Sequence, residues 1–247
     1  MADQEVISST ILSAQPRVWD RLSQIGSSEQ LGSAYLFSGP PGCGKEGNAL
    51  QFAQLLNCES GSDDSCGNCP SCKRFFRLQH ENLKLIFPLP TPKKNTDREN
   101  TGIDHKDLEM VTEAIAQKSD DPFFKIQIPR ANRILIQSIR ELRKSLYLKS
   151  ETSGRKMVLI FDAHLLSAGQ GEAANALLKL LEEPPENTTL VLVTDYIELL
   201  LPTILSRCQR VGFPRLDDSY IQNWFEMKMV RDIDIPFLTG LSRGNLH

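Results

Sequence analysis

The sequence predicts an α/β fold with a mostly parallel sheet that is covered by helices on both faces. Short apolar runs alternate along the chain with segments of helical periodicity, which is typical of strand–helix units in a parallel sheet. The apolar runs are nearly continuous, as expected for strands that are buried on both faces. A glycine-rich turn also lies between the first such strand and the next helix. The 247 residues are enough for one α/β core and a smaller piece.

The first half of the chain is expected to contain two helices and two strands before an insertion. "WDRLSQIGSSEQLG" predicts a helix and a loop, and "SAYLFSG" predicts a short buried strand. "GKEGNALQFAQLLN" predicts a helix, because Leu50, Ala53 and Leu56 recur at helical spacing. "FFRLQHENLKLIFPL" ends in a strand-like run. Residues 88–107 are rich in Pro, Lys, Asn and Asp, so we expect a mobile surface insertion, with a helix in "DLEMVTEAIAQK".

The second half repeats the alternation. "ANRILIQSIRELRKSLYLKS" predicts an amphipathic helix whose apolar side carries Ile134, Ile139, Leu142 and Leu146. "GRKMVLIFD" and "TTLVLVTD" predict buried strands. Between them, "GEAANALLKLLEEPP" predicts a helix that two prolines stop, Pro184 and Pro185. "LLPTILSRCQRVGF" predicts a turn, a short helix and a final strand, and the tail from Pro214 is expected to be helical.

The composition is that of an ordinary soluble globular protein. Apolar residues make up 40 % and charged residues 24 % of the chain. A net charge of −3 gives no global attraction to nucleic acid, so any DNA contact has to be a local patch. We expect no secretory signal, no membrane span and a cytoplasmic location. In a reducing cytoplasm, clustered cysteines more often bind metal than form disulfides.

The glycine-rich turn "SGPPGCGKE" matches the phosphate-binding pattern G-x-x-x-x-G-K-[ST] except at its last position, Glu46. Glycines there allow backbone N–H groups to face phosphate oxygens at a helix start, and the lysine reaches the β- and γ-phosphates. The alternative is a tight turn whose lysine is merely solvated. The expected nucleotide-binding residues are Gly39, Pro40, Pro41, Gly42, Cys43, Gly44, Lys45 and Glu46.

Two departures predict that this P-loop binds MgATP weakly or not at all. Glu46 replaces the hydroxyl that holds Mg²⁺. Two like charges about 4 Å apart repel by about 4 kcal/mol at an effective dielectric near 20. Asp162 is a lone acid at the end of "MVLIFD", where a working ATPase needs one acid for Mg²⁺ and many add a second for water. Asp162 could equally cap the next turn.

Four cysteines, Cys58, Cys66, Cys69 and Cys72, form the pattern C-x7-C-x2-C-x2-C. Four thiolates in a short loop suit a closed tetrahedral zinc site, which would be structural. The repeated two-residue spacing is also found at iron–sulfur clusters, but no redox motif accompanies it. Four free thiols are the remaining alternative. Cys43 and Cys208 are expected not to be ligands.

Taken in order, these segments resemble the AAA+ subunits of the bacterial sliding-clamp loader, part of the DNA polymerase III holoenzyme. The resemblance covers residues 15 to 247 and is carried by "YLFSGPPGCGKE", the four-cysteine module, "ANALLKLLEEPPENTTLVLVTD" and "LPTILSRC". Glu46 and the lone Asp162 make the chain more similar to the delta-prime subunit than to the ATP-hydrolysing gamma/tau subunit. The long insertion at 88–130 departs from both.

The resemblance implies a set of roles. Arg207, between Ser206 and Cys208, would act in trans on ATP bound to a neighbouring subunit, and guanidinium suits phosphate. Thr194 matches the sensor position, which contacts phosphate or water. Residues 1–213 would form the AAA+ domain, including the module at 58–72, and residues 214–247 would begin the helical lid, with no C-terminal collar domain and hence poor assembly alone. The implied partners are the other clamp-loader subunits, the sliding clamp and primer–template DNA.

Several readings remain open beside this one. Arg140, Arg143, Lys144 and Lys149 could line a DNA-facing surface, but a charge run is usually a solvated helix face. Arg207 could be a surface arginine paired with a nearby acid. The rival functions are an active ATPase of the gamma/tau type, a nucleotide kinase with a zinc-bearing lid, and a zinc-dependent DNA-binding protein. The acid-rich cysteine loop argues against the last.

Overall fold

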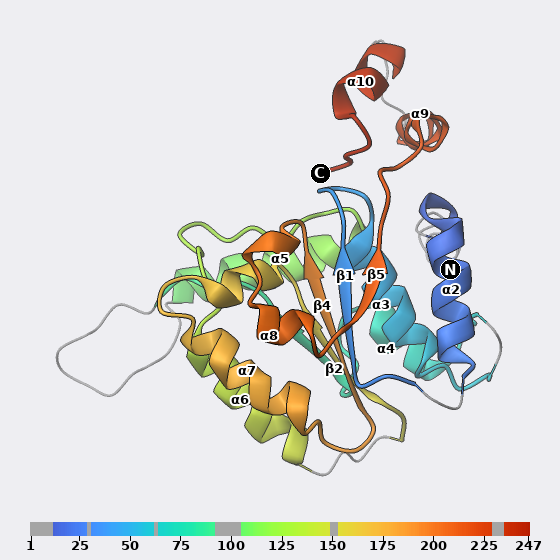
Figure 1. The fold of residues 1–247 in the computed structure, drawn as a ribbon. Helices are drawn as coiled ribbons and strands as arrows, with labels where there is room; N and C mark the ends of the chain where they lie inside the picture. The colour runs from blue at the N-terminus through green and yellow to red at the C-terminus, as the bar shows by residue number, and fades with distance from the viewer. Residues whose placement is uncertain (1–11, 29–30, 62–63, 92–104, 149–152, 229–234) are drawn as a thin grey trace.

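The computed structural model describes residues 12–28, 31–61, 64–91, 105–148, 153–228 and 235–247. These residues form a five-stranded sheet with the order β2-β3-β4-β1-β5, and every neighbouring pair of strands is parallel. The strands are β1 (Ala34–Ser38), β2 (Leu83–Ile86), β3 (Lys156–Ile160), β4 (Thr188–Thr194) and β5 (Gln209–Gly212). Figure 1 shows the sheet between two groups of helices.

Alternate residues of the strands point into two separate cores. Tyr35 and Phe37 of β1 pack into one core, whereas the intervening Leu36 packs into the other. The same alternation continues in the neighbouring β4, where Val191 and Leu192 face opposite cores. Because both faces are covered, each strand reads as a continuous apolar run, and all seven residues of β4 are buried.

Helices cover the two faces in two groups. One core contains residues of α2 (Pro16–Gly26), α3 (Lys45–Leu55), α4 (Pro70–Phe76), α5 (His105–Asp120) and α9 (Asp218–Met227). The other contains residues of α6 (Ile136–Tyr147), η1 (Ala163–Ser167), α7 (Glu172–Glu182) and α8 (Pro202–Leu205). The short η2 (Ile197–Leu199) precedes α8, and α10 (Ile235–Ser242) lies beside α9 away from the sheet (Figure 1).

The predicted elements are found, with two corrections. The predicted helix at 131–150 begins only at Ile136, and Ile134 is buried just before it. The predicted mobile surface segment at 88–107 is wrong at its start, because Pro88 and Pro90 are buried, and at Asp107, which is buried in α5. Residues 92–104 of that segment, and Lys149, lie outside the described residues. Among the described residues no helix is long and apolar enough to cross a bilayer.

Candidate nucleotide site and candidate metal centre

The P-loop lies where the sheet changes direction of winding. The chain leaves β1 toward β2 at one edge of the sheet and leaves β4 toward β5 at the other. Ligands of open parallel sheets bind outside the carboxyl ends of the strands at such a point. Ser38 at the end of β1 pairs with Thr194 at the end of β4. The P-loop therefore faces the residues that follow β4, and the residue after Thr194 is Asp195.

The P-loop lysine is held by the protein itself. The Nζ atom of Lys45 lies 2.7 Å from the Oδ1 atom of Asp195, and the two side chains are 3 % and 7 % exposed. Lys45 also donates to the carbonyl oxygens of Gly39, at 2.9 Å, and Pro40. Its three ammonium protons thus have three oxygen acceptors. The cation that would meet the β- and γ-phosphates is paired with a buried carboxylate.

Glu46 is not an isolated anion. Its Oε2 atom lies 2.5 Å from the Nζ atom of Lys118, whose side chain is fully buried. Lys118 comes from α5 and also donates to the carbonyl oxygens of Pro122 and Phe124, at 3.0 Å for Pro122. The predicted repulsion between Glu46 and phosphate therefore needs correction, because the carboxylate is already neutralised by a lysine 72 positions away in sequence.

A third lysine lies between two carboxylates. The Nζ atom of Lys125 is 2.9 Å from Asp162 and 2.8 Å from Asp195. Burial lowers the pKa of Lys125, but the charge of Asp162 and the contacts with Asp195 outweigh it, so that its pKa is raised above the usual range. Burial likewise raises the pKa of Asp195, but Lys45 and Lys125 outweigh it and hold that pKa below its usual value. Both groups stay charged near neutral pH.

Asp162 and Thr194 occupy the places expected of them at strand ends, with protein partners. Asp162 follows β3 with a left-handed backbone and makes no side-chain capping bond, so the capping alternative is wrong. The Oγ1 atom of Thr194 accepts the N–H of Tyr196 at 3.0 Å and lies 3.2 Å from the Nδ1 atom of His164. Burial lowers the pKa of His164.

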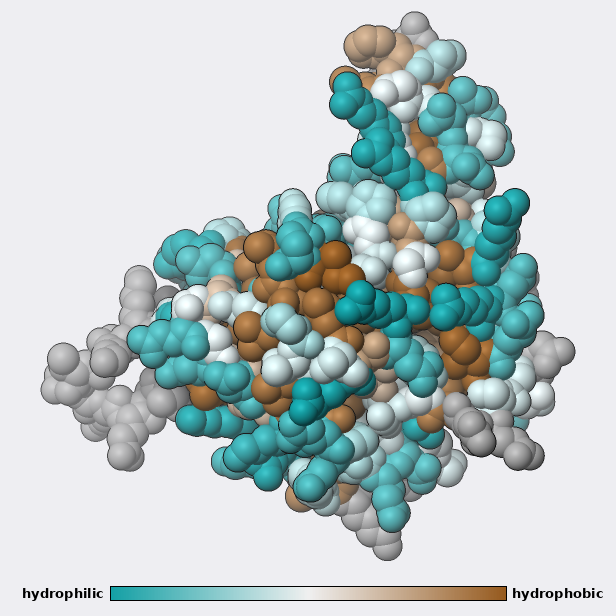
Figure 2. Space-filling model, viewed as in Figure 1, coloured by the Kyte–Doolittle hydropathy of each residue, from teal (hydrophilic) through white to brown (hydrophobic). Residues whose placement is uncertain are grey.

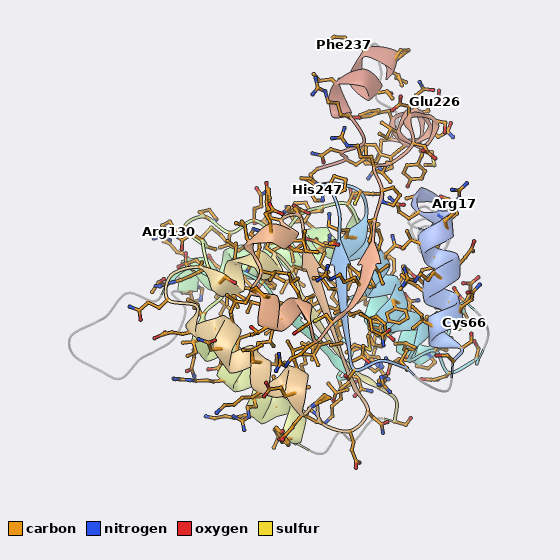
Figure 3. The ribbon with its side chains drawn as sticks, viewed as in Figure 1. Arg17, Cys66, Arg130, Glu226, Phe237 and His247 are labelled. Carbon is orange, nitrogen blue, oxygen red and sulfur yellow. The ribbon has the colours of Figure 1, made fainter. Side chains whose placement is uncertain are left out.

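The segment after α10 lies against the P-loop. The N–H of Leu246 donates to the carbonyl oxygen of Gly42 at 3.3 Å. Gly42 has φ +66°, and a side chain there would overlap the side chain of Asn245. His247 lies above the carboxyl end of β1 (Figure 3). Side chains fill the cradle so completely that the cavity among them measures about 10 Å³, room for about one water molecule.

The sequence predicted Lys45, Glu46, Asp162 and Thr194 as nucleotide-binding residues. All four lie at or just beyond the carboxyl ends of the strands. Sequence reasoning missed Asp195, Lys118 and Lys125. The position of Asp195 offered a signal, since it directly follows the buried strand β4 at its carboxyl end. The two lysines, Lys118 and Lys125, belong to the insertion at 88–130, whose role the sequence left open, and no motif marks them.

The four predicted cysteine ligands converge. The sulfurs of Cys58, Cys66, Cys69 and Cys72 all lie within 4.8 Å of one another, and those of Cys66 and Cys72 are 4.0 Å apart. A zinc ion with bonds of about 2.3 Å in a tetrahedron places its sulfurs about 3.8 Å apart. All six cysteines of the chain are free thiols. Cys43 and Cys208 lie outside the cluster.

The backbone of the cysteine loop is arranged to stabilise thiolates. The N–H of Cys69 donates to the sulfur of Cys66, and the N–H of Cys72 donates to that of Cys69. The N–H groups of Cys69 and Asn68 lower the pKa of Cys66 to about 6, whereas burial raises the pKa of Cys72. Four such sulfurs at these separations fit a tetrahedral metal ion such as zinc, and they could hold it without large movement.

Arg207 lies at the amino ends of the strands, whereas the P-loop lies at their carboxyl ends. Tyr35 of β1 pairs with Gln209 of the parallel β5, so Arg207 precedes the amino end of β5 while the P-loop follows the carboxyl end of β1. Its guanidinium is 2.7 Å from Glu182 and donates to the carbonyl oxygen of Thr203. The alternative of a surface arginine paired with a nearby acid is thus what the isolated chain adopts.

Apolar side chains gather over α8 and the segment before it (Figure 2). Two of the large apolar residues there are exposed, Tyr196 at 45 % and Leu199 at 55 %. Arg207 lies two residues beyond the end of α8, on the side of the sheet away from the P-loop. An exposed apolar patch is typical of a surface that meets another protein.

Comparisons with known proteins place the chain in one family. A family model described as DNA polymerase III, delta subunit, matches residues 14–217. The delta-prime subunit of DNA polymerase III from Bacillus subtilis is 31 % identical over 85 % of this chain and 50 % of its own length. The tau subunit from the same organism is 32 % identical over 76 % of this chain and 26 % of its length. The chain thus spans half or less of these two relatives.

A solved structure supports the fold. A DNA polymerase III gamma-subunit-related protein from Thermotoga maritima superposes with a TM-score of 0.54 at 22 % identity, covering 92 % of this chain and 54 % of that one. The parallel sheet, the P-loop at its winding point and the four-cysteine cluster agree with the sequence relationship. The chain therefore belongs to the DNA polymerase III delta-subunit family and is a clamp-loader-family subunit of the delta-prime type.

Proposed function

We propose that this chain is a non-hydrolysing subunit of a sliding-clamp loader, which supports ATP-dependent loading of the clamp onto primer–template DNA. Its partners would be gamma/tau-type and delta-type subunits and, through the complex, the clamp and DNA. The observation that carries the proposal is the pairing of the P-loop lysine, Lys45, with the buried Asp195. A nucleotide would have to displace that carboxylate, and no acid of the described residues adjoins Asp162 in sequence to polarise water.

The active contribution of the subunit would be Arg207. Because Arg207 lies at the amino ends of the strands, it does not reach the chain's own P-loop at their carboxyl ends. A neighbouring subunit docked at the amino ends could place its bound ATP beside this guanidinium. The pair with Glu182 is partly exposed, 34 % for the arginine and 48 % for the acid, so exchanging this partner for a phosphate costs little. Guanidinium supplied in trans accelerates phosphoryl transfer about 10³–10⁵-fold.

We also propose that the cysteine cluster holds a structural zinc ion. None of the described residues between Cys58 and Cys72 belongs to either hydrophobic core, although the indole of Trp19 in α2 donates to Asp64 within this loop. A closed four-thiolate site leaves no position for substrate, which favours a structural role over a catalytic one.

The test is reconstitution with the remaining clamp-loader subunits. The wild-type chain is expected to support a clamp- and DNA-stimulated ATPase that the Arg207→Ala variant loses. Arg210→Ala, an exposed arginine three residues away, is the matched control and should retain the activity. Full activity of the Arg207→Ala complex would refute the role in trans.

The alternative is an ATP-hydrolysing subunit of the gamma/tau type, which the similarity to tau subunits favours. Steady-state phosphate release by the purified chain separates the two proposals. We expect no release above background, and brisk hydrolysis without other subunits would establish the alternative.

A further inference from the structure

Three lysines and three carboxylates form a charge-balanced network of two parts around the P-loop: Lys118 pairs with Glu46, and the other four groups form a separate series of ion pairs. The members are Lys45, Lys118 and Lys125 with Glu46, Asp162 and Asp195. Their side chains are all at most 16 % exposed, and each ion pair is 2.9 Å or shorter. In a working P-loop site the lysine and a divalent cation balance the charge of the phosphates. Here the protein supplies both signs of charge.

Three of the members, Asp195, Lys125 and Lys118, contact the P-loop and strand-end residues that would otherwise face a magnesium nucleotide. The carboxylate of Asp195 contacts Lys45, the position of a β- or γ-phosphate oxygen. The ammonium of Lys125 bridges Asp162 and Asp195, the position of a divalent cation between the strand-end acid and a phosphate. Glu46, in place of the metal-binding hydroxyl, receives Lys118.

The network also joins three parts of the chain. Lys118 fixes the turn after α5 through the carbonyl oxygens of Pro122 and Phe124. The ring of Phe123 in that turn lies next to Gly44 and packs against Tyr220 and Trp224 of α9 at centroid distances of 6.2 and 6.3 Å. The P-loop, the 105–130 segment and α9 are therefore held together by protein contacts alone.

We propose that Lys118 and Lys125 of the 105–130 segment, with Asp195, are a built-in substitute for the magnesium nucleotide, which locks the P-loop closed and orders α9 against it. The proposal deepens the proposed function by giving the insertion a role: it fixes one conformation of the subunit whatever the nucleotide concentration. Entry of a nucleotide has to separate buried ion pairs, which weakens affinity about 10²–10³-fold.

The first measurement uses the wild-type chain and MgADP as the probe. Calorimetry is expected to give a dissociation constant no tighter than about 1 mM, the range of weak binding. Hydrogen exchange of residues 39–48 should be slow and unchanged by millimolar MgADP. Micromolar binding, or protection that appears only with MgADP, overturns the proposal whether or not any variant folds. The Arg207 role would survive that result, because a subunit can bind nucleotide without hydrolysing it.

The second measurement opens the site. The double variant Asp195→Ser/Lys125→Ser removes one charge of each sign and frees Lys45 and Asp162. Its affinity for MgADP should rise by about 10²-fold or more. The control removes an exposed ion pair, Arg74→Ser/Glu81→Ser, whose atoms are 3.5 Å apart, and should leave affinity unchanged. A folded Asp195→Ser/Lys125→Ser chain that binds MgADP no better than wild type also overturns the proposal.

Discussion

The helix α3 has a candidate ligand site at each end, and the two sites are built in opposite ways. At its amino end, the P-loop is filled by lysines and carboxylates of the chain itself. Beyond its carboxyl end, four cysteine sulfurs converge with N–H groups directed at them, an arrangement that could hold a metal ion. Figure 3 shows the separation, with His247 near the first end and Cys66 near the second.

The two ends of α3 show how the charges of a site indicate whether it can bind a ligand or is already filled by the protein's own side chains. Four thiolates that converge repel one another unless a cation lies between them, so such a cluster indicates a bound metal ion. Converging groups of both signs satisfy each other, and a ligand then has to compete with them. The charge balance of a site is therefore more informative than the presence of its motif.

The largest expected loss of stability follows the substitution of a cysteine in the four-cysteine cluster. Cys66→Ala should lower bound zinc from near one ion per chain to near none. It should also reduce the free energy of unfolding by about 5 kcal/mol, a part of the roughly 10–16 kcal/mol that structural zinc contributes in small zinc domains. Metal analysis and urea unfolding check both. Cys208→Ala, a cysteine outside the cluster, should keep its zinc. Zinc-free protein of unchanged stability would argue against a metal centre.

The next effect is at the P-loop end. Lys118→Met leaves the buried Glu46 without its partner and should cost about 3–5 kcal/mol of unfolding free energy. Glu46→Gln combined with Lys118→Met should recover most of it, because no buried charge is then unpaired. As a control, Lys228→Met breaks the partly exposed pair with Asp121 and should cost less than about 1 kcal/mol. Equal losses in the two lysine variants would show that the network is not special.

The smallest effect is a contrast in pH dependence. Because the pKa of Lys125 is raised, its contribution to stability is fully present below about pH 10.5, its unfolded pKa. Because the pKa of Asp195 is lowered, its contribution to stability is present above about pH 3.8, its unfolded pKa. The difference in unfolding free energy between wild type and Lys125→Met should therefore vary by less than about 0.5 kcal/mol from pH 5 to 9. Urea unfolding across that range checks it.

Over the same range the cysteine end should respond differently. Protons compete with metal for thiolates, so zinc should dissociate as the pH falls toward 5. A chromogenic chelator would follow the release. A network contribution that declined together with the zinc would mean that the two ends of α3 are coupled.

Most of the fold could be predicted from the sequence because its strands are buried on both faces. The run from Thr188 to Thr194 is apolar enough to be recognised without knowing its neighbours. The order of the strands and the start of α6 at Ile136 depend on packing between distant segments, which a local pattern does not contain.

The site was predicted where a motif marks it and missed where tertiary structure makes it. The positions of the P-loop, Gly39 to Lys45, and of the converging cysteines could be predicted because both motifs are recognisable by their spacing. The sequence presents Glu46 as an unpaired anion, because its partner Lys118 is 72 positions away and no local pattern connects the two. Lys125 belongs to the same insertion, and nothing local distinguishes it from a solvated lysine.

The interlocking of these charges constrains how the subunit could change over generations. If Asp195 alone were lost, Lys45 and Lys125 would each lose an acceptor, and if Lys118 alone were lost, Glu46 would be stranded. Each of these single losses should give a less stable chain, because it leaves a buried charge without a partner. A lineage that acquired this arrangement would find it far easier to keep than to reverse, since a reversal needs paired substitutions in segments some 70 positions apart.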